Sequence, residues 1–277
     1  LSYDWEKVVA PMWDEFLKGE SWRRDQPADP VGLETGGHVH RWGNTGLWLS
    51  GGAMALPCMI AGCDAYQEVG PGREPVVHAH GFYPATDLVF EDDPAGGVAK
   101  IVLREIQDDY KLAEIGFQPG DQVIDIGAHV GVVSCYIAKN YPGTLIYAFE
   151  PVQDNFERLA LNLERNGIGK ERVRAFPLGV TGDGREIVLN GDGRGNSGGW
   201  RAAGVHSGIV EQRTAHSTTL EQILLDNGIN RIKLLKLDCE GSEYEILYSA
   251  PEWVWKKIEY VAIEIHDQAP AYPHGQR

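Results

Sequence analysis

The chain has 277 residues, 43% of them hydrophobic and 23% charged, which is the composition of a globular protein with one large or two modest domains. Its formal net charge of −15 argues against nucleic acid or an anionic membrane as the main partner, because both attract clustered Lys and Arg. No apolar run approaches the roughly 18 residues of a membrane-spanning helix. The four cysteines lack C-x-x-C spacing, and the acidic segment Leu1–Lys18 does not resemble a signal peptide. We therefore expect a cytoplasmic protein with free thiols.

Residues 1–100 are expected to form an irregular, aromatic-rich N-terminal extension. Asp4–Lys18 has apolar residues at helical spacing, and short strands are expected at Leu47–Leu49 and Leu88–Phe90. The pairs His38/His40 and His78/His80 would hold a transition metal only if they converged, so we interpret them as ordinary polar residues. A role as lid, acceptor-binding element or dimer contact is the functional hypothesis for this extension.

From about Lys100 strands and helices alternate, which predicts a mainly parallel sheet with helices on both faces, a Rossmann-like α/β domain over residues 101–277. The predicted strands are Ile101–Ile106, Val123–Ile126, Leu145–Phe149, Val173–Val180, Glu186–Leu189, Ile232–Leu237 and Tyr260–Ile265. The predicted helices are Asp108–Ile115, Val132–Lys139, Gln153–Asn166, Thr218–Asn227 and Ser242–Ser249. The apolar face of the third is expected to contain Phe156, Leu159, Ala160 and Leu163, and the last has Ser242 and Glu245 at the spacing of a capping box.

A glycine turn, Gly127-Ala128-His129-Val130-Gly131, follows the first of the regular sheet strands. A pyrophosphate-binding turn needs G-x-G-x-x-G, but His129 occupies the place of the second glycine. The turn therefore suits a nucleoside ligand without a pyrophosphate. S-adenosylmethionine fits, because its amino-acid end can lie against the turn while Glu150, 19 residues after Gly131, accepts both ribose hydroxyls.

Every regular strand also ends in polar residues or glycine, and ligands of such sheets bind at the carboxyl ends of the strands. These residues are Asp125 and Gly127, Glu150, Gly179 and Val180, Asp238 and Glu240, and Glu264 and His266. The expected cofactor-binding residues are Asp125, Gly127, Ala128, His129, Gly131, Glu150, Pro151, Gly179, Val180 and Asp238.

At this point the chain resembles the FkbM family of S-adenosylmethionine-dependent methyltransferases over Val102–Gln268. The resemblance rests on EIQDDY before the first regular strand, on DIGAHVG and FEP, and most specifically on LKLDCEGSE followed by IEIH. It implies a Rossmann-like fold and methyl transfer, usually to a hydroxyl of a sugar or secondary metabolite. The implied acceptor is a small molecule or glycan, and a homo-oligomer is compatible with the sequence.

An alcohol acceptor must lose its proton, and His266 is the best general-base candidate because imidazole titrates near neutral pH. Asp238 and Glu240 would orient the acceptor, bind the cofactor's amino end or share the base role. The structural alternatives are a strand-capping His266 and a Glu243 that only favours the start of its helix. A Mg²⁺ site of Asp238, Glu240, Glu264 and His266 is a weaker alternative. N-methylation of an amine or peptide and an inactive cofactor-binding scaffold are the competing functions.

The C-terminal edge of the expected sheet lacks an obvious cover. Sheets of this type commonly finish with an antiparallel hairpin, but few residues follow His266. Either the chain is cut short, or N-terminal strands such as Leu88–Phe90 and Ile101–Leu103 cover that edge.

Overall fold

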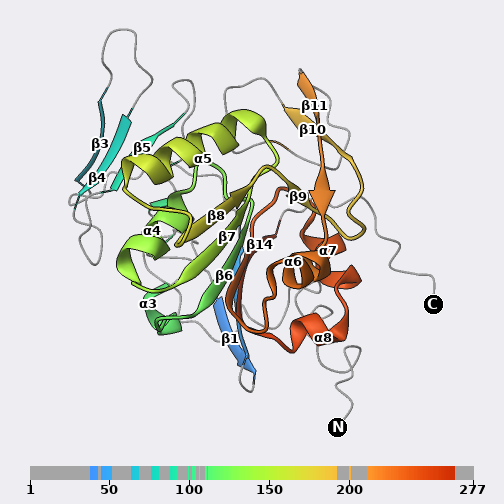
Figure 1. Cartoon of the computed structure of the whole chain (residues 1–277). Helices are drawn as coiled ribbons and strands as arrows, with labels where there is room; N and C mark the ends of the chain where they lie inside the picture. The colour runs from blue at the N-terminus through green and yellow to red at the C-terminus, as the bar shows by residue number, and fades with distance from the viewer. Residues whose placement is uncertain are drawn as a thin grey trace, which may run out of the picture.

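The computed structural model describes residues 38–42, 45–51, 64–68, 76–80, 88–92, 99, 102–103, 106, 110, 112–191, 200 and 211–265. Its centre is a seven-stranded sheet in the order β1-β2-β14-β13-β6-β7-β8 (Figure 1). The strands are β1 His38–Trp42, β2 Thr45–Gly51, β6 Gln122–Ile126, β7 Leu145–Phe149, β8 Val173–Phe176, β13 Ile232–Leu237 and β14 Ile258–Ile265. All neighbours pair in parallel except β1, which is antiparallel to β2. The predicted Rossmann-like α/β class is confirmed.

Helices cover both faces of this sheet (Figure 1). On one face lie α3 Leu112–Ile115, α4 Val132–Asn140 and α5 Gln153–Arg165, and on the other α6 Leu220–Asn227, α7 Glu243–Ser249 and α8 Glu252–Trp255. Consecutive strand residues enter opposite cores: Val123 packs with the first group of helices, and Ile124 with the second. Burial on both faces explains why the central strands are apolar runs without alternation.

The expected strand at Ile101–Ile106 is wrong, because Val102, Leu103 and Ile106 have helical backbone. Ala99, Leu103, Ile106 and Tyr110 are all buried in the first core, and their spacing of four, three and four residues is helical. A short window of β-branched and aliphatic residues hides this period.

The expected strand Val173–Val180 is really two strands, which moves Gly179 and Val180 out of the central sheet. β8 ends at Phe176, immediately before Pro177, which has no N–H to donate. β9, Gly179–Val180, pairs instead with β12, Ser217–Thr218. The strand expected near Glu186–Leu189 is present as β10, Ile187–Gly191, which pairs with β11, Glu211–Ala215.

Helix α5 carries asparagines where an apolar face was expected. Ala160 is exposed, whereas the side chains of Asn162 and Asn166 are buried. Their amides bind the backbone of β5, Leu88–Glu91: Asn162 Oδ1 accepts from the Glu91 N–H at 2.7 Å, and Asn166 Oδ1 accepts from the Val89 N–H at 3.0 Å. The two amide nitrogens donate to the carbonyls of the same residues, at 3.0 and 2.7 Å. The asparagines therefore satisfy the backbone groups on the edge of β5 that is not paired with β4.

Strand β2 covers the sheet edge beyond β14, where it pairs in parallel from Tyr260↔Gly46 to Ile265↔Gly51. The N-terminal region therefore supplies the cover, but not through the strands that were expected to do so. Leu88–Phe90 lies in β5 of a separate sheet with β3, Asp64–Glu68, and β4, Val76–His80. The two His-x-His pairs also fall on strands of different sheets, β1 and β4. The helix expected at Asp4–Lys18 lies outside the described residues, and the domain boundary near residue 100 stays a prediction.

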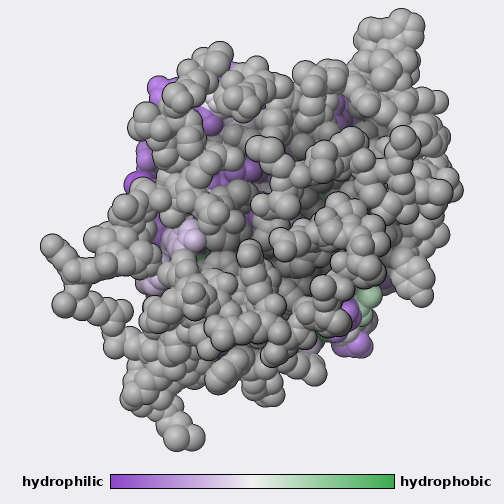
Figure 2. All heavy atoms as spheres, turned by 180° about the vertical axis from the view of Figure 1, so that it is seen from behind, coloured by the Kyte–Doolittle hydropathy of each residue, from purple (hydrophilic) through white to green (hydrophobic). Residues whose placement is uncertain are grey.

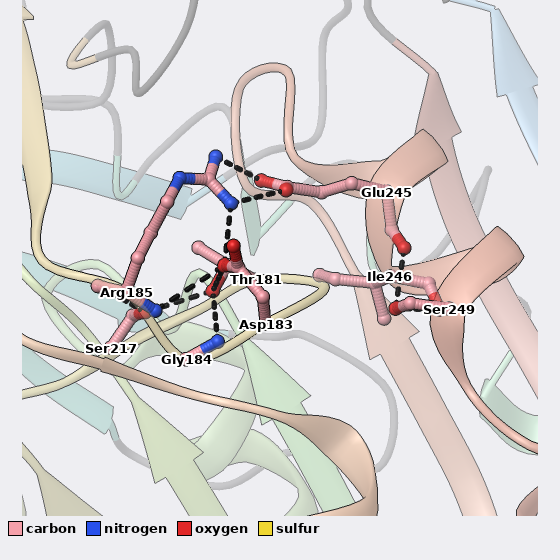
Figure 3. Close-up of polar contacts among 8 residues, drawn as sticks. All are labelled: Thr181, Asp183, Gly184, Arg185, Ser217, Glu245, Ile246 and Ser249. Carbon is pink, nitrogen blue, oxygen red and sulfur yellow. Dashed lines mark hydrogen bonds and ion pairs between the residues drawn. The ribbon is translucent and has the colours of Figure 1, made fainter.

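The expected capping box at the start of α7 is not formed. Ser242 makes no side-chain cap hydrogen bond, and Glu245 binds Arg185 instead, with Nη1 to Oε2 at 2.7 Å and Nη2 to Oε1 at 3.1 Å. Figure 3 shows this bidentate ion pair, which connects the turn between β9 and β10 with α7. Asp183 forms an ion pair with the same guanidinium. Thr181 Oγ1 accepts from the Gly184 N–H at 2.9 Å and shapes this turn. The pair ties the excursion after β8 to the helix that follows β13.

None of the described helices is long and apolar enough to cross a membrane. Seen from behind, the described surface in view is mainly hydrophilic, with a small hydrophobic area (Figure 2).

Candidate functional site

The carboxyl ends of β6, β7 and β13 meet at one edge of the sheet, as the parallel register requires. Gly127 follows β6 with φ +76°, and an added Cβ would lie 1.7 Å from the backbone oxygen of Asp238. The Asp238 N–H also donates to the Ile126 carbonyl at 3.2 Å. Only glycine permits this close approach of the turn to the end of β13.

The backbone N–H groups of the glycine turn are already engaged. Those of Gly127 and Ala128 donate to the Phe149 carbonyl at 3.0 Å each, and that of Gly131 donates to the Ala128 carbonyl at 2.8 Å. His129, at φ +50°, donates its N–H to Glu150 Oε2 at 2.8 Å. A pyrophosphate site needs such N–H groups aimed at the ligand. Four of the five in this turn point elsewhere, so the geometry agrees with a ligand that has no pyrophosphate.

Glu150 is 5% exposed at the end of β7. Its Oε1 accepts from the Val152 N–H at 2.9 Å and from Asn155 Nδ2 at 3.4 Å, while Oε2 accepts from His129. Burial raises the pKa of Glu150 to about 7, against the opposing effect of these hydrogen bonds. A carboxylate oxygen with one donor retains a lone pair for a second. Oε2 is therefore suited to accept from a hydroxyl of a bound ribose.

The His129 side chain is neutral near pH 7. Burial lowers its pKa to about 4, and the carboxylates of Asp92 and Asp238 only partly oppose that effect. Asp92 is itself buried and accepts from the Ala99 N–H at 2.7 Å. An imidazole with so low a pKa is a weak general base at neutral pH, and the hydrogen bond that joins His129 to Glu150 comes from its backbone N–H.

Lys236, which was not among the predicted site residues, is the buried cation of this edge. Its Nζ donates to the Gly127 carbonyl at 2.7 Å and lies 3.3 Å from both Asp125 Oδ1 and Asp238 Oδ2. Burial lowers the pKa of Lys236, but Asp238 and Asp125 more than compensate and hold it above its usual range. A lysine inside the apolar run of β13 was the signal in the sequence, because a charge in a doubly covered strand needs a buried partner.

The two aspartates beside Lys236 have different surroundings. Asp125 is fully buried, and its Oδ2 accepts from Ser134 Oγ of α4 at 2.7 Å. The side chain of Asp238 is 23% exposed, and its Oδ2 accepts from the Tyr110 hydroxyl at 3.2 Å. Of the two, Asp238 is the carboxylate that a ligand can reach.

The loop after β13 is held by Glu243, which is fully buried at the start of α7. Its two oxygens accept from the N–H groups of Cys239 and Gly241, at 2.9 Å each. Glu240 between them adopts φ +55°. Burial raises the pKa of the Cys239 thiol well above its usual range, which disfavours the nucleophilic thiolate form. Glu243 thus shapes the loop that carries Asp238 and Glu240.

The other predicted site residues that the structure describes lie in separate surroundings. An ideal Cβ on Gly131 would lie 3.1 Å from Leu159 Cγ, which packs the turn against α5, and one on Gly179 would lie 3.6 Å from Pro151. Val180 belongs to the second core. Glu264 lies on β14, and His266 is outside the described residues.

The magnesium alternative gains no support from the geometry. Among the described residues, no three His, Cys, Asp or Glu side chains are grouped so that they could hold a metal ion. His266, one member of the expected set, lies beyond this part of the chain.

Comparison with known proteins supplies a family. The family model of the methyltransferase FkbM domain matches residues 125–274. The 31-O-demethyl-FK506 methyltransferase FkbM of Streptomyces tacrolimicus is 28% identical over 200 residues, which are 62% of this chain and 76% of that protein. The hexuronic acid methyltransferase AglP of Haloferax volcanii is 25% identical over 219 residues, 79% of this chain and 78% of that protein. A solved methyltransferase FkbM from Methylobacillus flagellatus aligns with a TM-score of 0.36 and 16% identity over 51% of this chain, which is 32% of that protein.

Proposed function

The chain belongs to the FkbM methyltransferase family, and we propose that it transfers a methyl group from S-adenosylmethionine to a hydroxyl group of a small molecule or sugar. The observation that carries the cofactor assignment is the glycine turn, whose N–H groups are engaged beside the buried acid Glu150. The names of two relatives, one for a 31-O-demethyl substrate and one for a hexuronic acid, support an oxygen acceptor.

In this proposal the residues at the sheet edge divide the work. Glu150 accepts from the ribose hydroxyls, and the turn from Gly127 to Gly131 lies against the amino-acid end. When bound, S-adenosylmethionine supplies a methyl group on a cationic sulfonium. Asp125, Asp238 and Lys236 together carry one net negative charge beside a neutral His129, which favours a cationic ligand at this edge.

The acceptor side of the proposal rests on Asp238 and His266. Asp238 is partly exposed and can accept a hydrogen bond from an alcohol. His266 follows β14, whose carboxyl end lies beside that of β13, and it is proposed as the general base. Because methyl transfer is an in-line displacement, alignment of the two substrates and exclusion of water would supply most of the rate.

Calorimetry with S-adenosylmethionine and S-adenosylhomocysteine tests the cofactor. Both should bind the unaltered chain, and Glu150→Ala should abolish binding, while Glu157→Gln on the exposed face of α5 should not change it. Absence of binding to the unaltered chain refutes the proposal.

A labelled-methyl assay on a panel of sugars and hydroxylated metabolites then tests the acceptor class. His266→Ala should lower kcat far more than cofactor affinity. The reverse result would remove His266 as the base, and exclusive labelling of amines would contradict the hydroxyl acceptor.

A further inference from the structure

Asp238 is held from two sides, and both contacts end on the same oxygen. Lys236 Nζ lies 3.3 Å from Oδ2, and the Tyr110 hydroxyl donates to Oδ2 at 3.2 Å. Lys236 stands on β13, whereas Tyr110 lies 128 residues earlier in the chain, before the first regular strand. A carboxylate with two donors on one oxygen cannot turn about its side chain without breaking both contacts.

The same lysine also holds the glycine turn. Its Nζ donates to the Gly127 carbonyl at 2.7 Å and forms an ion pair with Asp125. One buried cation, 3% exposed, therefore connects the turn at the end of β6 with the carboxylate at the end of β13. In the proposed function these are the cofactor side and the acceptor side of the site.

We propose that Lys236 and Tyr110 are positioning residues that hold Asp238 with Oδ1 facing the methyl acceptor, at a fixed distance from the cofactor turn. The inference rests on the proposed function and adds to it. Neither residue touches the reacting atoms; each acts through Asp238. Because in-line transfer is sensitive to displacements of about 1 Å, loss of either contact should lower the rate of transfer more than cofactor binding.

Tyr110→Phe is the most direct test, because it removes only the hydroxyl. We expect kcat to fall about tenfold or more, with the Kd of S-adenosylmethionine within about twofold of the unaltered value. Tyr147→Phe is the matched control: this tyrosine is also buried, and its hydroxyl accepts from Gln122 at the opposite end of β6. If Tyr110→Phe behaves like this control, the inference is wrong.

The role of Lys236 is tested by substitutions that remove or keep its positive charge. Lys236→Met should lower kcat strongly and weaken cofactor binding as well, because the turn loses its donor, and Lys236→Arg should recover part of kcat because it keeps the cation. Lys233→Met is the control, since Lys233 is a buried lysine of the same strand, three residues before Lys236. Its Nζ forms an ion pair with Glu259 at 2.9 Å. Equal kcat values for the Arg and Met variants would overturn the role of the charge. If Lys236→Met does not fold, the kcat of Lys236→Arg, compared with those of the unaltered chain and of Tyr110→Phe, still tests the role of Lys236.

A double-mutant cycle separates positioning from general structural support. If Tyr110 acts through Asp238, Tyr110→Phe should have almost no further effect on kcat in an Asp238→Ala background, where the hydroxyl has no side-chain acceptor at position 238. Additive losses would show an independent, structural role and refute the inference. Failure of the unaltered chain to bind S-adenosylmethionine would instead refute the proposed function, so the two failures are distinguishable.

Discussion

Glu150 and His129 are joined by a hydrogen bond, and burial moves their pKa values in opposite directions. That of Glu150 is raised from 4.5 to about 7, and that of His129 is lowered from 6.5 to about 4. Between pH 4.5 and 7 the folded chain keeps a proton on Glu150 that the unfolded chain has released, so this group lowers stability as pH rises. Between pH 6.5 and 4 the unfolded chain takes up a proton on His129 that the folded chain refuses, so this group lowers stability as pH falls.

The two effects are similar in size and nearly cancel. A pKa difference of about 2.5 corresponds to about 3.5 kcal/mol for each residue, at about 1.4 kcal/mol for each pKa unit. For His129, which is partly exposed, this is an upper bound. Removing one partner should therefore reveal the pH dependence of the other. Glu150→Gln and His129→Asn are suitable changes, because glutamine keeps the shape and asparagine tolerates the φ of +50° at position 129.

Urea unfolding of the three proteins between pH 4 and 8 measures the effect. The stability of Glu150→Gln minus that of the unaltered chain should rise by about 3 kcal/mol from pH 4.5 to 7. The same difference for His129→Asn should fall by up to about 3 kcal/mol from pH 4 to 6.5. The N–H that loses its carboxylate acceptor in Glu150→Gln adds a constant offset of about 1–3 kcal/mol, which does not change these slopes. Flat differences, or slopes of the opposite sign, would refute the reasoning.

Three further predictions concern parts of the fold that hold the site. Gly127→Ala should abolish cofactor binding and destabilise the chain by more than about 3 kcal/mol. Gly167→Ala is the control: its φ is similar, but an added Cβ would meet nothing within 4 Å, so it should cost only about 1 kcal/mol. Equal melting temperatures of the two variants would contradict this prediction. Asn162→Ala should destabilise the chain by about 2–4 kcal/mol and make β5 sensitive to limited proteolysis, while Asn190→Ala on the β10–β11 hairpin should stay within about 0.5 kcal/mol. Glu243→Gln should lower the free energy of unfolding by about 1–3 kcal/mol in chemical denaturation and should also lower kcat, because an amide offers only one acceptor oxygen to the two N–H groups of the loop. Unchanged stability would mean that the loop does not depend on this carboxylate.

The parts of the site that could be predicted from sequence are local in the chain. Strands β6, β7 and β13 are buried on both faces, so their apolar runs mark them clearly, and the carboxyl end of each strand fixes where Gly127, Glu150 and Asp238 lie. The glycine at position 127 is dictated by the close approach of Asp238.

The rest could not be predicted, because it depends on contacts between distant segments. Tyr110 meets Asp238 across 128 residues, and Asn162 meets the backbone of β5 across 71. The sequence shows a lysine within the apolar run of β13, but not that Lys236 bridges two aspartates and a turn carbonyl. Misassigned elements have local causes: Pro177 divides one expected strand into two, and aliphatic residues such as Leu103 fit strand and helix alike over a short window.

The placement of charge at this edge is better explained by geometry than by stability. Burying Lys236 between Asp125 and Asp238 removes Lys236 and Asp125 from water and leaves Asp238 only partly exposed, and such groups are often no more stabilising than apolar residues of the same size. What the cluster does provide is a fixed relation between β6 and β13, because separating their ends would leave a buried charge without its partner. Apolar packing cannot impose that constraint on the direction of a carboxylate. The buried charges of Lys236 and Asp125 thus lie where the turn after β6 and Asp238 at the end of β13 are held at a fixed distance.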